Sequence, residues 1–310
     1  MHRTKYTIGL FFVFLSLVFA CILLFRILNI DPEALVVPIT ETFSQIDIPF
    51  LETKQSKNES LAKAVQTVKL NPDDTYGIVI QNFKTNETYA FNEHRHFQSA
   101  SLYKLWIMAV VYDEIQNGRL RETDTLQQEI PILNEKFAIA SEDAELTEGS
   151  ISLSVTGALE RMITVSDNYA ALLLSEKVRL SIVSKFLSSH GFTESKIGTD
   201  GSMPTTTPSD IAKFFTLIHE GKLINREYDT KMLNLLKGQK LNNKIPKNLP
   251  ENTVVAHKTG ELNSLTHDAG IVFAKNGDYV IAVLSESTTP DNAEQTIADL
   301  SETIYRYFTK

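Results

Sequence analysis

The order of strand-like and helix-like segments along the chain constrains the fold more than any other feature. Segments rich in β-branched and aromatic residues occur early in the chain and return only near its end, at residues 75–83, 87–97, 253–260, 265–275 and 278–287. The first two are separated by Lys84-Thr85-Asn86, which suits the turn of a hairpin. Most of the residues between these two groups have the apolar spacing and the capping residues of helices, and a last helix is predicted over about residues 291–308.

This order predicts an α+β fold. An antiparallel sheet of about five strands is assembled from both ends of the chain and flanked by helices. An all-helical lobe is inserted into it at about residues 112–213. The first helix of this body is expected to begin near Asn58 or Ser60, so that the body covers residues 58–310.

The N-terminal segment predicts attachment to a membrane. Residues 7–25 carry no charged side chain, and the run reaches the roughly 20 residues that cross a bilayer as a helix. Arg3 and Lys5 precede it, so residues 1–30 are interpreted as a cytoplasmic tip and an anchor. Residues 31–57, with three prolines, are interpreted as a stalk. We therefore expect a single-pass protein of the cell membrane with its body on the extracytoplasmic side.

Two alternatives to an uncleaved anchor remain open. Small residues at Val18-Phe19-Ala20 would suit cleavage of a signal peptide, and Cys21 would suit a lipidated N-terminus. The apolar run continues through residues 22–25, which favours the anchor. All three alternatives place the body outside the cytoplasm.

Composition excludes several kinds of chemistry. The net charge of −8 argues against nucleic acid as a partner. Cys21 is the only cysteine, so the body has no disulfide, no cysteine nucleophile and no thiolate metal site. His94 and His96 alternate on one strand face but have no third ligand nearby, and neither a metal nor another cofactor is expected.

Ser101 and Lys104 form a possible nucleophile and base. Their spacing puts both on one helix face, where a partly desolvated lysine can take the proton of a serine hydroxyl. The start of the helix also offers the backbone N–H of Ser101 to a developing oxyanion. Taken alone, the pair is better described as a helix cap and a surface lysine.

Two further motifs change this balance. Ser166-Asp167-Asn168 stands where one predicted helix gives way to the next, and Lys258-Thr259-Gly260 stands at the end of a predicted strand. Each triplet alone is ordinary capping or turn sequence. Together and in this order, the three motifs resemble those of the penicillin-recognising serine hydrolases, which are the class A β-lactamases and the D-alanyl-D-alanine peptidases. The stretches around Ser166 and Pro208 are similar to class A sequences as well.

The resemblance implies the β-lactamase/transpeptidase-like fold and a role for each motif residue. Ser101 would be acylated, Lys104 would be its proton partner, and Ser166 would pass a proton to the leaving nitrogen. Asp167 would fix its loop. The substrate would be held by Asn168, by Lys258, Thr259 and Gly260, and by the backbone N–H of Glu261.

The chain departs from the class A pattern at the residue that activates the deacylating water. The stretch from Asn168 to Thr205 is short and lacks the glutamate motif of class A enzymes. Of the available carboxylates, Glu176 falls inside a predicted apolar helix too soon after Asn168, and Glu194 and Asp200 are interpreted as solvated loop groups. Without such a base, release of the acyl group is slow or uses another residue.

A second departure concerns the binding of the substrate carboxylate. Glu261-Leu262 follows the glycine where class A enzymes have small residues, and residues 259–274 contain no lysine or arginine. The auxiliary arginine of the family is therefore absent there. His267 could replace it as a weak cation, but a structural histidine is the preferred interpretation.

These observations predict a serine acyl-hydrolase of the class A β-lactamase type, acting through an acyl-Ser101 intermediate. The alternative is a membrane-anchored D-alanyl-D-alanine carboxypeptidase that β-lactams trap. A covalent β-lactam sensor and an inactive binding domain rank below both. The expected partners are a β-lactam or a D-Ala-D-Ala peptide, with peptidoglycan as a further partner and the membrane through residues 7–25. The chain is expected to act as a monomer.

Overall fold

A computed structural model describes residues 49–310 of the chain, with side chains from Asn58 onward. At its centre lies a five-stranded antiparallel sheet with the strand order β2-β1-β9-β8-β7. The strands are β1 (Thr75–Asn82), β2 (Thr88–Phe91), β7 (Val254–Leu262), β8 (Leu265–Phe273) and β9 (Tyr279–Glu286). The predicted sheet, built from both ends of the chain, is confirmed.

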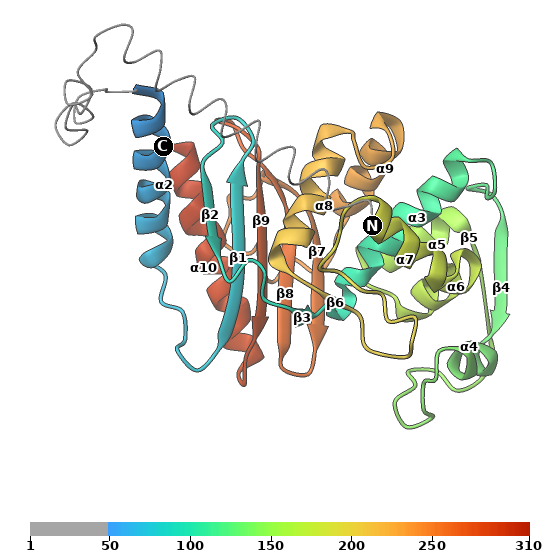
Figure 1. The fold of residues 1–310 in the computed structure, drawn as a ribbon. Coiled ribbons are helices and arrows are strands. Elements are labelled where there is room, and N and C mark those ends of the chain that lie inside the picture. Colours follow the sequence, from blue (N-terminus) through green and yellow to red (C-terminus); the bar gives the residue numbers. More distant parts are fainter. Residues whose placement is uncertain (1–48) are drawn as a thin grey trace, which may run out of the picture. The chain divides into compact units, whose positions relative to one another are not determined.

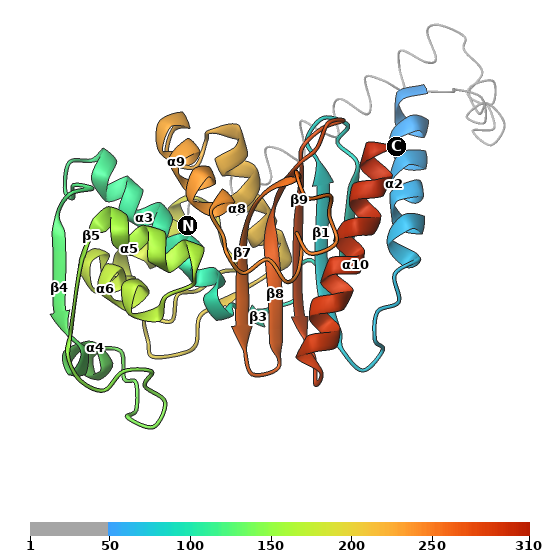
Figure 2. The same cartoon turned by 180° about the vertical axis from the view of Figure 1, so that it is seen from behind.

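Both faces of this sheet are covered, which is why its central strands read as continuous apolar runs. Helices α2 (Pro49–Gln66) and α10 (Pro290–Thr309) lie side by side on one face (Figures 1 and 2). Ile281 and Val283 of β9 belong to the core on that face, whereas Ala282 and Leu284 belong to the core on the other. Helix α8 (Pro208–Glu220) packs against this second face.

The inserted lobe is not all-helical, and this part of the prediction was wrong. Its helices are α3 (Lys104–Gln116), α4 (Ile130–Lys136), α5 (Val155–Thr164), α6 (Asn168–Val178) and α7 (Leu180–Ser189). Within it, strand β4 (Thr125–Glu129) pairs with β5 (Ser150–Ser154). The physical reason is visible in β5, where Ile151 and Leu153 alternate with serines, a spacing of two residues and not of a helix.

The N-terminal helix also begins earlier than predicted, at Pro49 instead of near Asn58 or Ser60. Proline is well tolerated in the first turn of a helix, and no glycine or further proline interrupts the residues that follow. Helix α9 (Arg226–Lys237) and the two-residue strands β3 (Phe97–Gln98) and β6 (Thr205–Thr206) were not predicted.

The predicted anchor over residues 7–25 and most of the predicted stalk lie outside the described residues. Within residues 49–310, no helix has both the length and the apolar character needed to cross a membrane.

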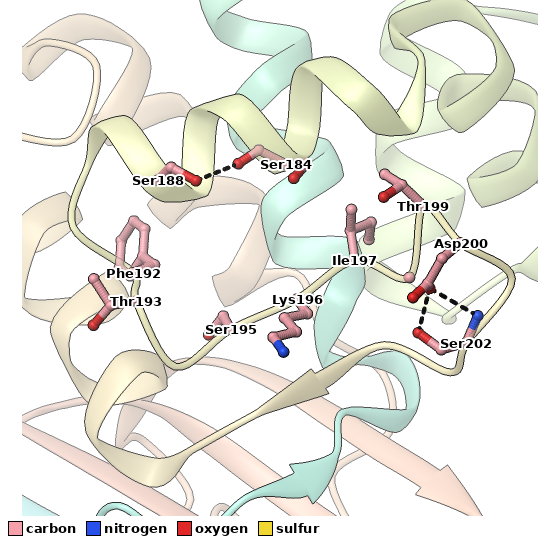
Figure 3. A pocket seen from close by; sticks show the side chains of 11 residues that line it. Ser184, Ser188, Phe192, Thr193, Ser195, Lys196, Ile197, Thr199, Asp200 and Ser202 are labelled. Atoms are coloured by element: carbon pink, nitrogen blue, oxygen red, sulfur yellow. Dashed lines mark hydrogen bonds between the residues drawn. The ribbon is translucent and has the colours of Figure 1, made fainter.

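The segment between α7 and β6, residues 190–204, contains no helix or strand and lies beside α7. A backbone bridge joins Lys196 to Thr205 and fixes the end of the segment. Together with Ser184 and Ser188 of α7, the segment lines a cavity of about 430 Å³, and Asp200 points into this region (Figure 3). It forms the last part of the short stretch between Asn168 and Thr205, after α6 and α7.

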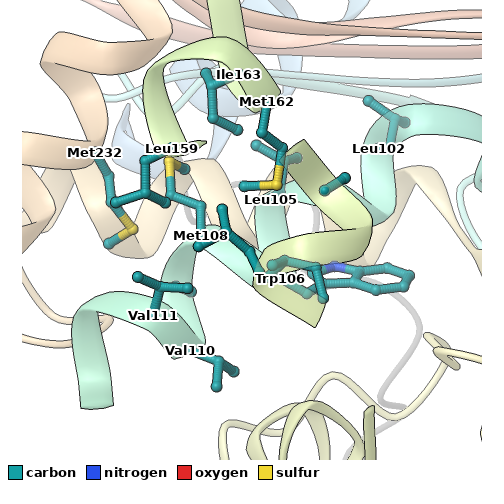
Figure 4. Packing of buried hydrophobic residues seen from close by; sticks show 14 of the residues in the cluster. Leu102, Leu105, Trp106, Met108, Val110, Val111, Leu159, Met162, Ile163 and Met232 are labelled. Carbon is teal, nitrogen blue, oxygen red and sulfur yellow. The ribbon is translucent and has the colours of Figure 1, made fainter. Parts of the chain in front are cut away.

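Helix α3 lies in the hydrophobic core that the lobe shares with one face of the sheet. Its residues 104–112 are all buried. Met108 packs close to Leu159 and Met162 of α5 and to Met232 of α9 (Figure 4). A helix that is apolar on every side must be surrounded by protein, so the first residue of α3, Lys104, is carried into the interior.

Candidate active site

Ser101 lies in a single turn of 3₁₀-helix, η2 (Ala100–Tyr103), and not in the α-helix that follows it. In such a turn, residues three apart stand above one another, so Ser101 and Lys104 lie on one side of it, but the hydrogen bonds of the Lys104 amine go to Ser166 and Asn168 and none goes to Ser101. Ala100 has a φ of 43°, which is unusual for a residue other than glycine. The Ser101 hydroxyl has no hydrogen-bond partner among residues 49–310, and its side chain is partly exposed.

The Ser166 motif forms the turn between α5 and α6. Ser166 itself has a φ of 59°. Asp167 caps α6 by accepting a 2.8 Å hydrogen bond from the Ala170 N–H, and Arg161 Nε donates to it at 2.9 Å. Asp167 is thus occupied in holding the turn, which is the role expected for it. The strained backbone of Ser166 is maintained by these contacts.

Lys104 connects the first motif to the second. Its ammonium group donates to the Ser166 carbonyl oxygen at 2.5 Å, to Ser166 Oγ at 3.1 Å and to Asn168 Oδ1 at 2.7 Å. The side chain is fully buried. Burial disfavours the charged form and lowers the pKa of Lys104 to about 8, although the nearby carboxylates of Asp167 and Glu145 oppose this. Lys104 is therefore a buried amine and not a surface charge.

Lys258 brings the third motif to the same hydroxyl. Its ammonium group donates to Ser166 Oγ at 3.1 Å and to the Thr259 carbonyl oxygen at 2.7 Å. Burial, followed by the positive charge of Lys104, lowers the pKa of Lys258 to about 7. The Ser166 hydroxyl consequently lies between two buried amines, each 3.1 Å from its oxygen.

Gly260 allows the Ser101 turn to approach strand β7. A Cβ atom at this position would lie 3.2 Å from the Ser99 carbonyl oxygen and 3.3 Å from the His267 side chain. The strand continues to Leu262, so the motif lies within β7 and not at its end as predicted. The structure therefore brings all three motifs together, and the side chain of Glu261 next to them forms an ion pair with Lys244.

His267 is not a cation. Burial lowers its pKa to about 4. Its Nδ1 accepts a hydrogen bond from the Ser285 N–H, and its Nε2 donates to the Gln98 carbonyl oxygen at 2.9 Å. The preferred interpretation of a structural histidine agrees with these contacts. The buried cation beside β7 is Lys244, which comes from the loop before the strand and was not singled out in the sequence.

Glu145 is the second site residue that the sequence did not indicate. Asn168 Nδ2 donates a hydrogen bond to Glu145 Oε1. Together with Ser166, Asn168 and Arg161, Glu145 lines a cavity of about 490 Å³. It lies in the irregular segment between α4 and β5, where no motif or periodic pattern could have identified it.

The three carboxylates considered as bases have structural partners elsewhere. Glu176 accepts from Gln128 at 3.1 Å and pairs with Lys136, and Glu194 accepts from Thr207 at 2.8 Å. Asp200 accepts from its neighbour Ser202 in the loop shown in Figure 3. None of these contacts involves a motif residue.

His94 and His96 were considered as metal ligands because they alternate on one strand face. His94 Nδ1 lies 3.0 Å from a Glu194 carboxylate oxygen. In the part of the chain that the structure describes, no three histidine, cysteine, aspartate or glutamate side chains are grouped as metal ligands would be.

Comparison with known proteins agrees with the motifs and the fold. The chain matches the beta-lactamase enzyme family over residues 60–308. It belongs to that family. This family member is 23% identical over 278 residues to β-lactamase VEB-1 of Pseudomonas aeruginosa, covering 82% of this chain and 92% of the relative.

Solved structures extend the comparison. The fold is similar to that of PBP-A, with a TM-score of 0.71 and 23% identity over 81% of this chain and 96% of that one. It is equally similar to a β-lactamase of Sphaerobacter thermophilus, with a TM-score of 0.70 and 25% identity over 81% and 97% of the two chains. A mutant of PBP-A is known as an acyl-enzyme complex with penicillin G. The predicted resemblance to class A β-lactamases is confirmed, and the chain is a serine hydrolase of that type.

Proposed function

We propose that this serine hydrolase opens the amide bond of β-lactams through an ester on Ser101. The observation that supports the proposal most strongly is the Ser166 hydroxyl held between the buried amines of Lys104 and Lys258. A buried amine with a pKa of about 8 is uncharged in roughly a tenth of molecules at pH 7 and can then accept a proton. Surface lysines with a pKa near 10.4 are almost never in that state.

In the proposed reaction, Ser101 Oγ attacks the lactam carbonyl carbon while its proton passes to the neutral amine of Lys104. The C–N bond then breaks as the ring nitrogen receives a proton through the Ser166 hydroxyl. The backbone N–H groups of Ser101 and Glu261 stabilise the oxyanion. Lys258 and Thr259 hold the substrate carboxylate, with Gly260 keeping the strand close, and Asn168 holds the side-chain amide.

A D-alanyl-D-alanine carboxypeptidase is the second candidate function. It is favoured by the structural engagement of Glu176, Glu194 and Asp200, none of which contacts the motif residues. An enzyme without a base for the deacylating water would be acylated by a β-lactam and would release it slowly. The same Ser101 chemistry would then act on a peptide of the cell wall.

Turnover and trapping are separated by one experiment. The full chain in detergent micelles is mixed with a chromogenic cephalosporin, and absorbance and intact mass are followed together. Continuous turnover supports the β-lactamase. A stoichiometric burst with a lasting adduct supports the peptidase or a sensor. Ser101→Ala should abolish the adduct, with Ser99→Ala, at the residue before the turn, as the control. The absence of both turnover and adduct would refute the whole set.

We also propose that the body acts outside the cytoplasm, held in the cell membrane by residues 7–25. The uncharged run in the sequence supports this proposal. The chain should then stay with membranes in alkaline carbonate and be digested by protease added to spheroplasts. Release of the chain from membranes by carbonate would contradict the anchor.

A further inference from the structure

The side-chain amide of Asn168 is oriented by charged groups at both ends. Its Oδ1 accepts from the Lys104 ammonium group at 2.7 Å, and its Nδ2 donates to Glu145. A flipped amide would place its oxygen against a carboxylate and its NH₂ group against an ammonium, so only one orientation satisfies both neighbours. One of the two Nδ2 hydrogens remains for a substrate carbonyl.

Glu145 differs from the other carboxylates next to the motifs because, within residues 49–310, no basic side chain forms a direct ion pair with it. Asp167 is bound by the Arg161 guanidinium, and Glu261 is bound by Lys244. Among residues 49–310, the only hydrogen bond of the Glu145 carboxylate comes from the neutral amide of Asn168. The Lys104 ammonium group acts on this charge only from the far side of the Asn168 amide, so one carboxylate oxygen is left without a direct partner.

This charge faces the space that a substrate side chain would enter. Glu145 and Asn168 line the same cavity of about 490 Å³. The one cation lining it, Arg161, already donates through Nε and Nη2 to Asp167. A group held at Asn168 Nδ2 thus lies next to a carboxylate that is exposed to solvent and that has room for an ion-pair partner.

We propose that Glu145 is a specificity residue that selects substrates whose amide side chain carries an ammonium group. The inference rests on the proposed function, because it assumes that the substrate amide binds at Asn168. The ammonium group would pair with the free carboxylate oxygen of Glu145 while the amide carbonyl accepts the remaining Nδ2 hydrogen. A substrate with a carboxylate at the same position would be repelled.

The test uses three penicillins with the same nucleus and a phenylacetyl side chain, whose α-carbon carries hydrogen, an amino group or a carboxylate. The second-order rate constant for acylation of the full chain in detergent micelles is measured at pH 6.5 by intact mass, where an α-amino group is protonated. An exposed ion pair is worth up to about 1 kcal/mol, so each step from amino to hydrogen to carboxylate should slow acylation by about fivefold.

Glu145→Gln keeps an acceptor for Asn168 and removes the charge. In this variant the three second-order rate constants should become similar. The effect should come from a change in the apparent binding constant, with little change in the maximal rate of acylation. Glu148→Gln is the matched control, since this exposed carboxylate lies in the same segment, and it should leave the order intact.

The outcomes separate the two proposals. Acylation by all three penicillins at equal rates, or an order that survives Glu145→Gln, would overturn the role of Glu145 and leave the proposed function standing. A loss of the order in Glu148→Gln would assign the effect to the charge of the whole segment and would also overturn it. If none of the three compounds acylates Ser101, the proposed function fails and the inference fails with it.

Discussion

Replacing Lys104 by methionine should reduce the pH dependence of folding stability between pH 7 and 9.5, leaving the part that comes from Lys258. Burial lowers the pKa of Lys104 to about 8 in the folded state, whereas an unfolded lysine has a pKa near 10.4. The unfolded chain therefore binds more protons in this range, and the wild-type stability rises with pH. The destabilisation by Lys104 falls from about 3 kcal/mol at pH 7 to about 1 kcal/mol at pH 9.5, a change of about 2 kcal/mol that methionine removes.

The assay is urea unfolding of the full chain in detergent micelles at both pH values. Trp106, the only tryptophan, is buried in α3 and reports unfolding of the core by its fluorescence. Methionine also leaves the Ser166 carbonyl oxygen and Asn168 Oδ1 without the Lys104 donor, while Lys258 still donates to Ser166 Oγ; that loss is the same at both pH values and cancels in the comparison. Lys69→Met, at an exposed lysine, is the control and should change nothing. If the stability difference between Lys104→Met and wild type is equal at pH 7 and 9.5, burial does not lower this pKa and the argument for Lys104 as a base is refuted.

Three further substitutions test the geometry of the site. Gly260→Ala should slow acylation of Ser101 by about tenfold, because the new Cβ would lie only 3.2 Å from the Ser99 carbonyl oxygen and displace the Ser101 turn. An unchanged acylation rate would show that the turn accommodates the methyl group without loss of geometry. Arg161→Ala should lower the free energy of unfolding, measured by urea titration, by about 1 kcal/mol, because the pair with Asp167 is partly exposed; acylation should slow as well if the turn loosens. Glu194→Gln should leave the rate of deacylation unchanged, since Glu194 is engaged with Thr207, and a large loss measured by intact mass would restore it as a candidate base.

The motif residues could be placed on their elements from the sequence because each motif depends on local structure. Ser101 and Lys104 are three residues apart, Asp167 caps the helix that follows it, and Lys258 stands on a strand with a clear β-branched pattern. The sheet was predicted for the same reason. Such features are determined by neighbours in the chain, which a sequence displays directly.

The sequence did not identify Lys244 and Glu145, because their importance comes from tertiary contacts. Both lie in irregular segments, and neither position follows a helical or strand period. Only the packed fold shows that Lys244 is fully buried beside Glu261. The all-helical lobe was wrong at Ile151 for another reason, because the short alternating stretch of β5 runs directly into the helix that begins at Val155.

The Ser166 hydroxyl has a single hydrogen and two amine neighbours, so it can donate to only one of them at a time. When both lysines are charged, Ser166 Oγ accepts from each and its own hydrogen points elsewhere. When one lysine is neutral, the hydroxyl can turn and donate to that amine while it still accepts from the other. When both lysines are neutral, the single hydroxyl hydrogen can reach the lone pair of only one amine nitrogen, and the other nitrogen receives no hydrogen bond from Ser166. The Ser166 hydroxyl and the two lysines are therefore best hydrogen-bonded when one lysine is charged and the other is neutral. When Lys104 takes up a proton, Ser166 can release one toward Lys258 or the substrate by rotation of its hydroxyl group.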